Sequence, residues 1–174
     1  MLPVRTGAQQ EPALLTSDMQ TAELLLRRAC PDRDEPHQKL HDLQAVLYIS
    51  VSRSRAGRAR FVLSKGHAAA VTSFSQAAIG CYDVSDIYKE YATDFGRFGM
   101  HSCNLANPYV DVSTGSLGHG FPVAGGMAAA LKRKGSGSRV FTVVGDGECG
   151  EGSIWEAAMF AHQYKLGDLV VFID

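Results

Sequence analysis

Residues 140–147 read VFTVVGDG, and this stretch decides the fold. The run Val140–Val144 is continuously apolar and rich in β-branched residues, which is typical of a strand buried on both faces of a parallel sheet. Gly145-Asp146-Gly147 follows at its carboxyl end, where open parallel sheets bind ligands. A carboxylate between two glycines suits a cation that bridges protein to phosphate, because Mg2+ prefers oxygen ligands. The tripeptide alone is weak evidence, since such turns also occur without a ligand.

The segments on either side of this turn complete an α/β unit. A helix fits Ser153–Lys165, Gly167 ends it, and Leu169–Ile173 reads as a second buried strand. Upstream, Phe61–Ser64 reads as a short buried strand, and Ala124–Lys134 as a helix of small residues. Strand, turn, helix and strand make a βαβ unit, so we expect an α/β fold with a parallel sheet and flanking helices.

The rest of the chain divides into further short elements. We expect a flexible tail over residues 1–15 and a single domain, incomplete at its end, over residues 16–174. The region 95–120 is rich in Gly, Asn, Ser and His, which predicts a loop. Helices are predicted over residues 17–30, 40–51, 68–71 and 85–91.

Composition excludes several classes of protein. The chain has 174 residues, of which 45% are hydrophobic, and a net charge of -1. This near-neutral balance argues against nucleic-acid and membrane-surface binding. The arginine-rich stretch 52–60 is therefore expected to be a solvated loop. No apolar run is long enough to span a bilayer, there is no leader layout, and the four cysteines read as reduced thiols, so we expect a cytoplasmic protein.

Three motifs together indicate a family. They are Leu63-Ser64-Lys65-Gly66-His67, the segment 112–120 (VSTGSLGHG), and the segment 145–158 (GDGECGEGSIWEAA). In this order and spacing they resemble the thiamine-diphosphate enzymes of the transketolase family. The resemblance covers residues 61–174. Within the family, these motifs are most similar to those of the two-subunit transketolases, in which the diphosphate-binding region is a separate N-terminal chain.

The resemblance implies cofactor-binding roles for the motif residues. Asp146 would bind the Mg2+ ion of thiamine diphosphate, and Gly145 and Gly147 would approach the diphosphate through their backbone. The histidine of the first motif, His67, would lie near the diphosphate and the reacting centre as a catalytic residue. The Thr-Gly loop would hold the aminopyrimidine side through the residues Gly115 and Leu117.

The remaining implied roles concern substrate and partner. His101 is the nearest match to a family histidine that contacts substrate, although its flanking residues differ from the family's Gly-His-Pro. His119 lies inside the Thr-Gly loop and is expected to be structural. Glu151 and Glu156 match acidic positions at or near the contact between protomers. Glu156 could equally lie on a solvated helix face.

Two departures from the family pattern qualify the resemblance. Arg33 occupies the place of a substrate-contacting histidine near the N-terminus, which suggests a different substrate or impaired sugar transfer. The family's metal-binding Asn would fall beyond Asp174, so the chain is expected to be truncated at its C-terminus. The aminopyrimidine-binding domain, with the glutamate that activates the cofactor, would come from a separate C-terminal transketolase-like subunit.

The implied activity is the transfer of a two-carbon ketol or acyl unit from a ketose or 2-keto acid donor to an aldehyde acceptor, in a homo- or hetero-oligomer. Two alternatives remain open. One is the first component of a 2-keto-acid dehydrogenase, which shares the Gly-Asp-Gly motif. The other is a non-catalytic, truncated paralogue.

Overall fold

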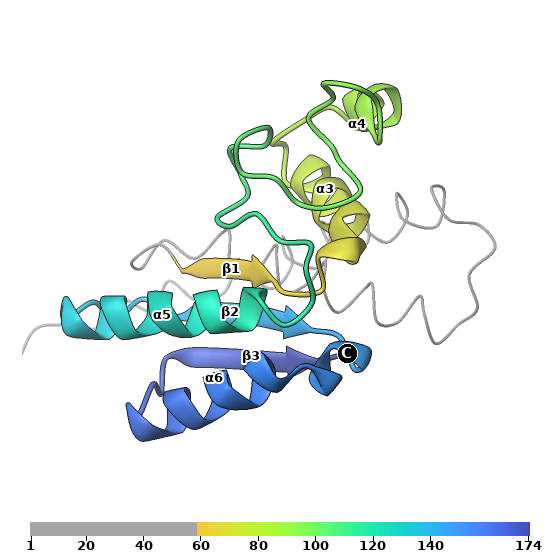
Figure 1. Cartoon of the computed structure of the whole chain (residues 1–174). Helices are drawn as coiled ribbons and strands as arrows, with labels where there is room; N and C mark the ends of the chain where they lie inside the picture. The colour runs from red at the N-terminus through yellow and green to blue at the C-terminus, as the bar shows by residue number, and fades with distance from the viewer. Residues whose placement is uncertain (1–58) are drawn as a thin grey trace, which may run out of the picture.

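The computed structural model describes residues 59–174, which form a three-stranded parallel sheet with helices packed against it (Figure 1). The strands are β1 (Arg60–Leu63), β2 (Val140–Val144) and β3 (Leu169–Ile173), in the spatial order β1-β2-β3. In the register, Leu63 pairs with Val143, and the last residues of β2 and β3 pair with each other. The carboxyl ends of all three strands therefore lie next to one another, along one edge of the sheet that we call the carboxyl edge. This edge lies beside the end of the chain in Figure 1.

Two helices cover one face of the sheet. They are α5 (Gly120–Arg133) and α6 (Gly152–Gln163), which lie side by side in front of β2 and β3 in Figure 1. The small residues of α5 let this helix lie close to the strands. The core under α5 consists of Val62, Val140, Ala124, Ala128 and Leu166, and the core shared with α6 of Val144, Phe121, Ile154 and Ala157.

A second group of helices lies beyond β1. The 3-10 turn η1 (Gly66–Ala68) leads from β1 into α3 (Ala69–Ala78), and α4 (Val84–Glu90) packs against α3. Their common core contains Val71, Phe74, Ile87 and Phe98, all buried. Phe98 comes from the long segment between α4 and α5, so its burial in this core holds that segment against α3 and α4.

The predicted elements within residues 59–174 are confirmed, with shifts of one or two residues at several ends and two larger differences in extent. Helix α5 begins at Gly120 and not at Ala124, because Pro122 lies in its first turn, where a missing N–H costs nothing. Helix α3 extends to Ala78, beyond the predicted residues 68–71.

The prediction that β3 is a buried strand is wrong for this part of the chain. Strand β3 is at the edge of the described sheet, so Val171 and Ile173 are 37% and 67% exposed. Strand β2 lies between two neighbours and is buried except for the half-buried Phe141, as predicted.

Other expectations concern the cysteines and the membrane. Cys81, Cys103 and Cys149 are free thiols, in agreement with the sequence. Within residues 59–174, no helix combines the length and the apolar composition that a membrane crossing requires. The predicted tail, the two N-terminal helices and the arginine-rich stretch lie almost wholly outside the described residues.

Candidate functional site

The site begins where β1 and β2 end next to each other. The backbone N–H groups of Ser64 and Lys65 both donate to the carbonyl of Val143, at 2.9 and 3.2 Å. This contact holds the turn after β1 against the last residues of β2. His67 follows in η1 with an exposed side chain. The predicted histidine therefore lies at the carboxyl edge of the sheet and is open to a ligand.

The Thr-Gly loop packs directly on this turn, and two glycines make that possible. A side-chain carbon on Gly66 would lie 2.8 Å from the backbone N of Gly115. A side-chain carbon on Gly120 would lie 2.7 Å from Ser64 Oγ and closer still to its Cα. Real Cβ contacts are essentially never this short. Glycine is thus required at both positions if the two loops are to touch backbone to backbone.

The Gly-Asp-Gly turn forms the third side of the site. Gly145 is buried, whereas Asp146 and Gly147 are exposed. Asp146 begins the 3-10 turn η2 (Gly147–Gly150), and its Oδ1 accepts a hydrogen bond from Gly147 N at 2.6 Å. The N–H of Asp146 donates to the carbonyl of Asp174 at 2.7 Å, which ties the turn to the end of β3. An exposed carboxylate is therefore fixed at the strand end, as the sequence predicts.

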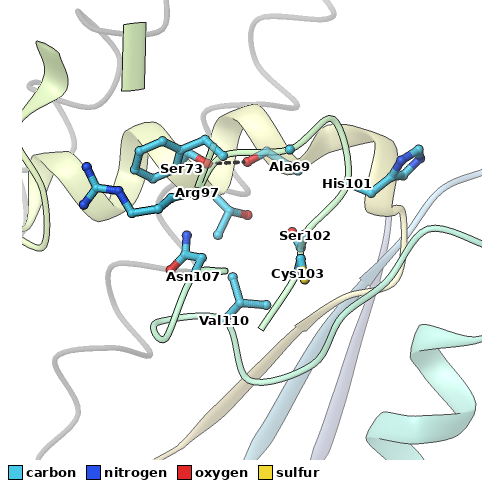
Figure 2. A pocket seen from close by; sticks show the side chains of 11 residues that line it. Ala69, Ser73, Arg97, His101, Ser102, Cys103, Asn107 and Val110 are labelled. Carbon is cyan, nitrogen blue, oxygen red and sulfur yellow. Dashed lines mark hydrogen bonds between the residues drawn. The ribbon is translucent and has the colours of Figure 1, made fainter. Parts of the chain in front are cut away.

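His101 joins the same group of loops. A side-chain carbon on Gly115 would lie 3.4 Å from the His101 ring, and Thr114 N donates to the carbonyl of Ser102 at 3.1 Å. Figure 2 shows His101 at the rim of a small pocket between α3 and the segment 97–110. The structure thus places His101 beside the Thr-Gly loop despite its unusual flanking residues.

The loop that carries His101 is anchored by a polar network. Arg97 Nε donates to Glu90 Oε2 at 2.7 Å, and the guanidinium lowers the Glu90 pKa to about 2. Further along, Asn107 Nδ2 donates to Gln76 Oε1 at 2.8 Å in a buried contact, and Tyr82 Oη donates to Asn107 Oδ1 at 3.1 Å. These bonds connect the segment after α4 to α3 and α4.

One cysteine in the same loop has a perturbed thiol. Backbone N–H groups of Ala106 and Leu105 point at the sulfur of Cys103 and lower its pKa. Cys103 lines the pocket of Figure 2.

The remaining predicted residues lie around this centre. Leu117 is 38% exposed beside Gly118, whose φ of +79° favours glycine. His119 is exposed and its Nδ1 lies 3.0 Å from the Leu117 carbonyl oxygen, in a local contact that suits the structural role expected of it. Glu151 and Glu156 are both exposed at the start of α6 and within it.

Sequence reasoning missed three residues at this site. Glu148 is 1% exposed, and its carboxylate binds groups from all three loops, among them the hydroxyl of Ser64 at 2.7 Å. Lys65 Nζ lies 2.6 Å from Asp174 Oδ2 in an ion pair whose side chains are 11% and 3% exposed. The only sequence signal for Glu148 is its spacing from Gly145, since a carboxylate three residues on can reach back to a backbone N–H.

The donor set fits a metal that is bound mainly through a phosphate ligand. The described residues contain no cluster of three or more acidic, histidine or cysteine side chains around a common point. Asp146 instead offers one exposed carboxylate at the strand end. Mg2+ is commonly held by one or two carboxylates together with phosphate oxygens and water, so this arrangement fits it. Arg33, the departure near the N-terminus, lies outside the described residues.

Comparison with known proteins identifies the family. Residues 48–174 match the family model described as "Transketolase, thiamine diphosphate binding domain". Two curated relatives are each named as one subunit of an apulose-4-phosphate transketolase. The one from Phocaeicola vulgatus is 42% identical over 74% of this chain and 47% of its own length. The one from Actinobacillus succinogenes is 41% identical over 66% of this chain and 41% of its own length.

A solved structure supports the same assignment. The Pichia stipitis transketolase in complex with sedoheptulose 7-phosphate has a TM-score of 0.74 and 27% identity, over 93% of this chain and 27% of its own length. The chain spans about half the length, or less, of the curated relatives that it matches. The chain therefore belongs to the transketolase family, of which it carries the N-terminal thiamine diphosphate-binding domain.

Proposed function

We propose that this chain is the diphosphate-binding part of a transketolase-like transferase, which moves a two-carbon ketol or acyl unit from a ketose or 2-keto acid donor to an aldehyde acceptor. The observation that carries the proposal is the meeting of three loops at one sheet edge. They are the turn 64–67, the Thr-Gly loop 112–120 and the turn 145–147. Glycine-dependent backbone contacts join the first two, and the Glu148 carboxylate, which accepts from Ser64, Gly118 and Gly145, joins the third to them. The relatives named as subunits of an apulose-4-phosphate transketolase support a sugar phosphate as donor.

Thiamine diphosphate and Mg2+ are the proposed cofactors. Asp146 would bind the metal, and Gly145 and Gly147 would allow the diphosphate to approach the backbone. Gly115 and Leu117 would hold the aminopyrimidine side. When bound, the cofactor supplies the nucleophilic carbon and the electron sink that this transfer needs.

The histidines would then move protons at the substrate. His67 and His101 are exposed on neighbouring loops, and His101 packs on the Thr-Gly loop. A positioned imidazole suits proton transfer near neutral pH and typically contributes about 100- to 10,000-fold to a rate. We assign the two histidines to proton transfers to and from the hydroxyl and carbonyl oxygens of donor and acceptor.

A C-terminal transketolase-like subunit is the proposed partner, and it would supply the aminopyrimidine-binding domain. Helix α6 presents large apolar side chains to solvent, in a pattern that suits a protein contact. Trp155 and Met159, one helical turn apart, are 61% and 66% exposed. Clusters of exposed apolar residues mark interaction surfaces. The acidic residues Glu151, just before α6, and Glu156, within it, would contribute to this interface.

The cofactor assignment is tested by calorimetry with the chain and its C-terminal subunit together. We expect the wild type to bind thiamine diphosphate in a Mg2+-dependent manner. Asp146→Asn should weaken this binding at least about tenfold, because it removes the carboxylate charge at the metal. Asp168→Asn makes the same change just before β3 begins. Asp168 lies at the amino ends of the strands, away from Asp146 at their carboxyl ends, so this variant should leave the affinity unchanged. Absence of binding by the assembled wild type would refute the proposed function.

The donor class is tested by the same assembly. Release of aldehyde from a ketose phosphate, in the presence of an aldehyde acceptor, would support transketolase-like transfer. Turnover of pyruvate instead would favour a 2-keto-acid dehydrogenase component.

The partner surface has its own test. In sedimentation experiments, Met159→Lys should weaken association with the C-terminal subunit by about tenfold or more. Leu105→Lys makes the same change at a residue that is 94% exposed but distant from α6 in the chain, and should not affect assembly. Equal behaviour of the two variants would exclude α6 from the interface.

A further inference from the structure

Glu148 connects three segments that are far apart in the chain. Its Oε1 accepts hydrogen bonds from Ser64 Oγ at 2.7 Å and from Gly118 N at 2.8 Å. Its Oε2 accepts a hydrogen bond from Gly145 N at 3.1 Å. One carboxylate therefore holds the turn after β1, the Thr-Gly loop and the Gly-Asp-Gly turn at the same time.

The environment of Glu148 makes these three bonds important. The side chain is 1% exposed, and no ion pair among residues 59–174 involves it. A buried carboxylate is unfavourable unless its oxygens are hydrogen-bonded. All three partners are donors, which suits a carboxylate that only accepts. The loops must consequently keep their positions for this carboxylate to stay satisfied.

The contact reaches further through Ser64. Its Oγ accepts a hydrogen bond from Phe121 N at 2.9 Å while its hydroxyl donates to Glu148. Phe121 belongs to the first turn of α5, so one chain of hydrogen bonds runs from that helix start to Glu148. On the other side, Ser153 Oγ of α6 donates to the carbonyl of Gly118 at 2.7 Å. The Thr-Gly loop is thereby fixed between β1 and α6.

This arrangement matters because the loops bear on different ends of one ligand under the proposed function. Asp146 and Gly147 would hold the diphosphate, whereas Gly115 and Leu117 would hold the aminopyrimidine. The distance between those two groups is set by the cofactor itself, so the loops must keep a fixed separation. We propose that Glu148 is the positioning residue that holds the cofactor loops in register through Ser64, Gly118 and Gly145. This inference rests on the proposed function.

The test compares the same change, Glu to Gln, at two positions. In Glu148→Gln, one carboxylate oxygen becomes an NH2 group that cannot accept, so the contact with Gly118 or with Gly145 must break. Glu90→Gln is the matched control, since the Glu90 carboxylate also accepts from a backbone N–H and a side chain, those of Arg97. The control site lies in the α4 region, away from the three loops.

Two measurements separate positioning from simple stabilisation. In the cofactor-free chain, Glu148→Gln should speed amide hydrogen exchange at Gly118 and Gly145 by about tenfold or more, and Glu90→Gln should not. In the chain assembled with its C-terminal subunit, Glu148→Gln should raise the Kd for thiamine diphosphate with Mg2+ at least about tenfold. Glu90→Gln should lower the melting temperature and leave this Kd unchanged.

A milder variant covers the case in which Glu148→Gln does not fold. Ser64→Ala removes one donor and keeps the carboxylate, so it should speed exchange at Phe121 and raise the Kd by a smaller factor. Unchanged exchange at the loop amides, or faster exchange with an unchanged Kd, would overturn the positioning role. If the assembled wild type binds no thiamine diphosphate, the proposed function fails. The exchange measurements, which need no cofactor, would still decide whether Glu148 orders the loops.

Discussion

Two substitutions on helix α5, Gly120→Ala and Gly126→Ala, add the same methyl group but should change stability in opposite directions. At Gly120 the new carbon would lie 2.7 Å from Ser64 Oγ and 2.8 Å from Ser64 Cβ, and nearer to the Cα. At least one of these contacts involves backbone, so the loop must move. At Gly126 no atom outside the local helix lies within 4 Å of the new carbon.

The expected magnitudes follow from these distances. Forcing a methyl group into a packed contact costs about 1–3 kcal/mol, so Gly120→Ala should be destabilising by that amount. Replacing an exposed glycine within a helix by alanine stabilises by about 0.5–1 kcal/mol, which is the expectation for Gly126→Ala. In a chain of this size, 1 kcal/mol corresponds to about 2–4 °C in melting temperature. We therefore expect a fall of about 2–12 °C for the first variant and a rise of about 1–4 °C for the second.

Thermal unfolding followed by circular dichroism measures both changes. The displaced loop should also break the bond from Phe121 N to Ser64 Oγ, so Gly120→Ala should weaken cofactor binding in the assembled enzyme while Gly126→Ala should not. A Gly120→Ala variant as stable as the wild type, or a fall in Tm of equal size in both variants, would refute the argument that backbone contact between the loops requires glycine here.

Two further predictions concern charged side chains. Lys65→Met removes the cation beside the Asp174 carboxylate, whose side chain is 3% exposed. Urea denaturation should therefore show a free energy of unfolding that is lower by about 3–5 kcal/mol. A decrease below about 1 kcal/mol would contradict a buried ion pair. Arg97 lowers the Glu90 pKa to about 2 from the usual 4.5, so the stability it contributes is present above pH about 4.5 and is lost as the pH falls toward 2. The difference in Tm between wild type and Arg97→Gln should accordingly be full at pH 6 and shrink toward pH 2, and a difference that stays constant would contradict this linkage.

The sequence predicted the arrangement of the sheet edge because its signals are local. The apolar run of β2 ends at a Gly-Asp-Gly turn, and parallel strands bring such turns to one edge. The place of Asp146 follows from these two facts alone. The exposed edge of β3 did not follow, because the apolar pattern of Leu169–Ile173 is the same for an edge strand and a central one.

The three glutamates after the Gly-Asp-Gly turn mark where sequence reasoning stops. Glu148, Glu151 and Glu156 are the same residue type, and the sequence predicted a role only for Glu151 and Glu156. The structure separates them by direction: η2 turns Glu148 inward, where Ser64 and Gly118 supply donors, while Glu151 and Glu156 remain exposed. Those donors come from residues 84 and 30 positions away, so no local pattern could reveal them. The residue that connects the three loops thus takes one partner, Gly145, from its own turn and the other two, Ser64 and Gly118, from contacts that only the tertiary fold creates.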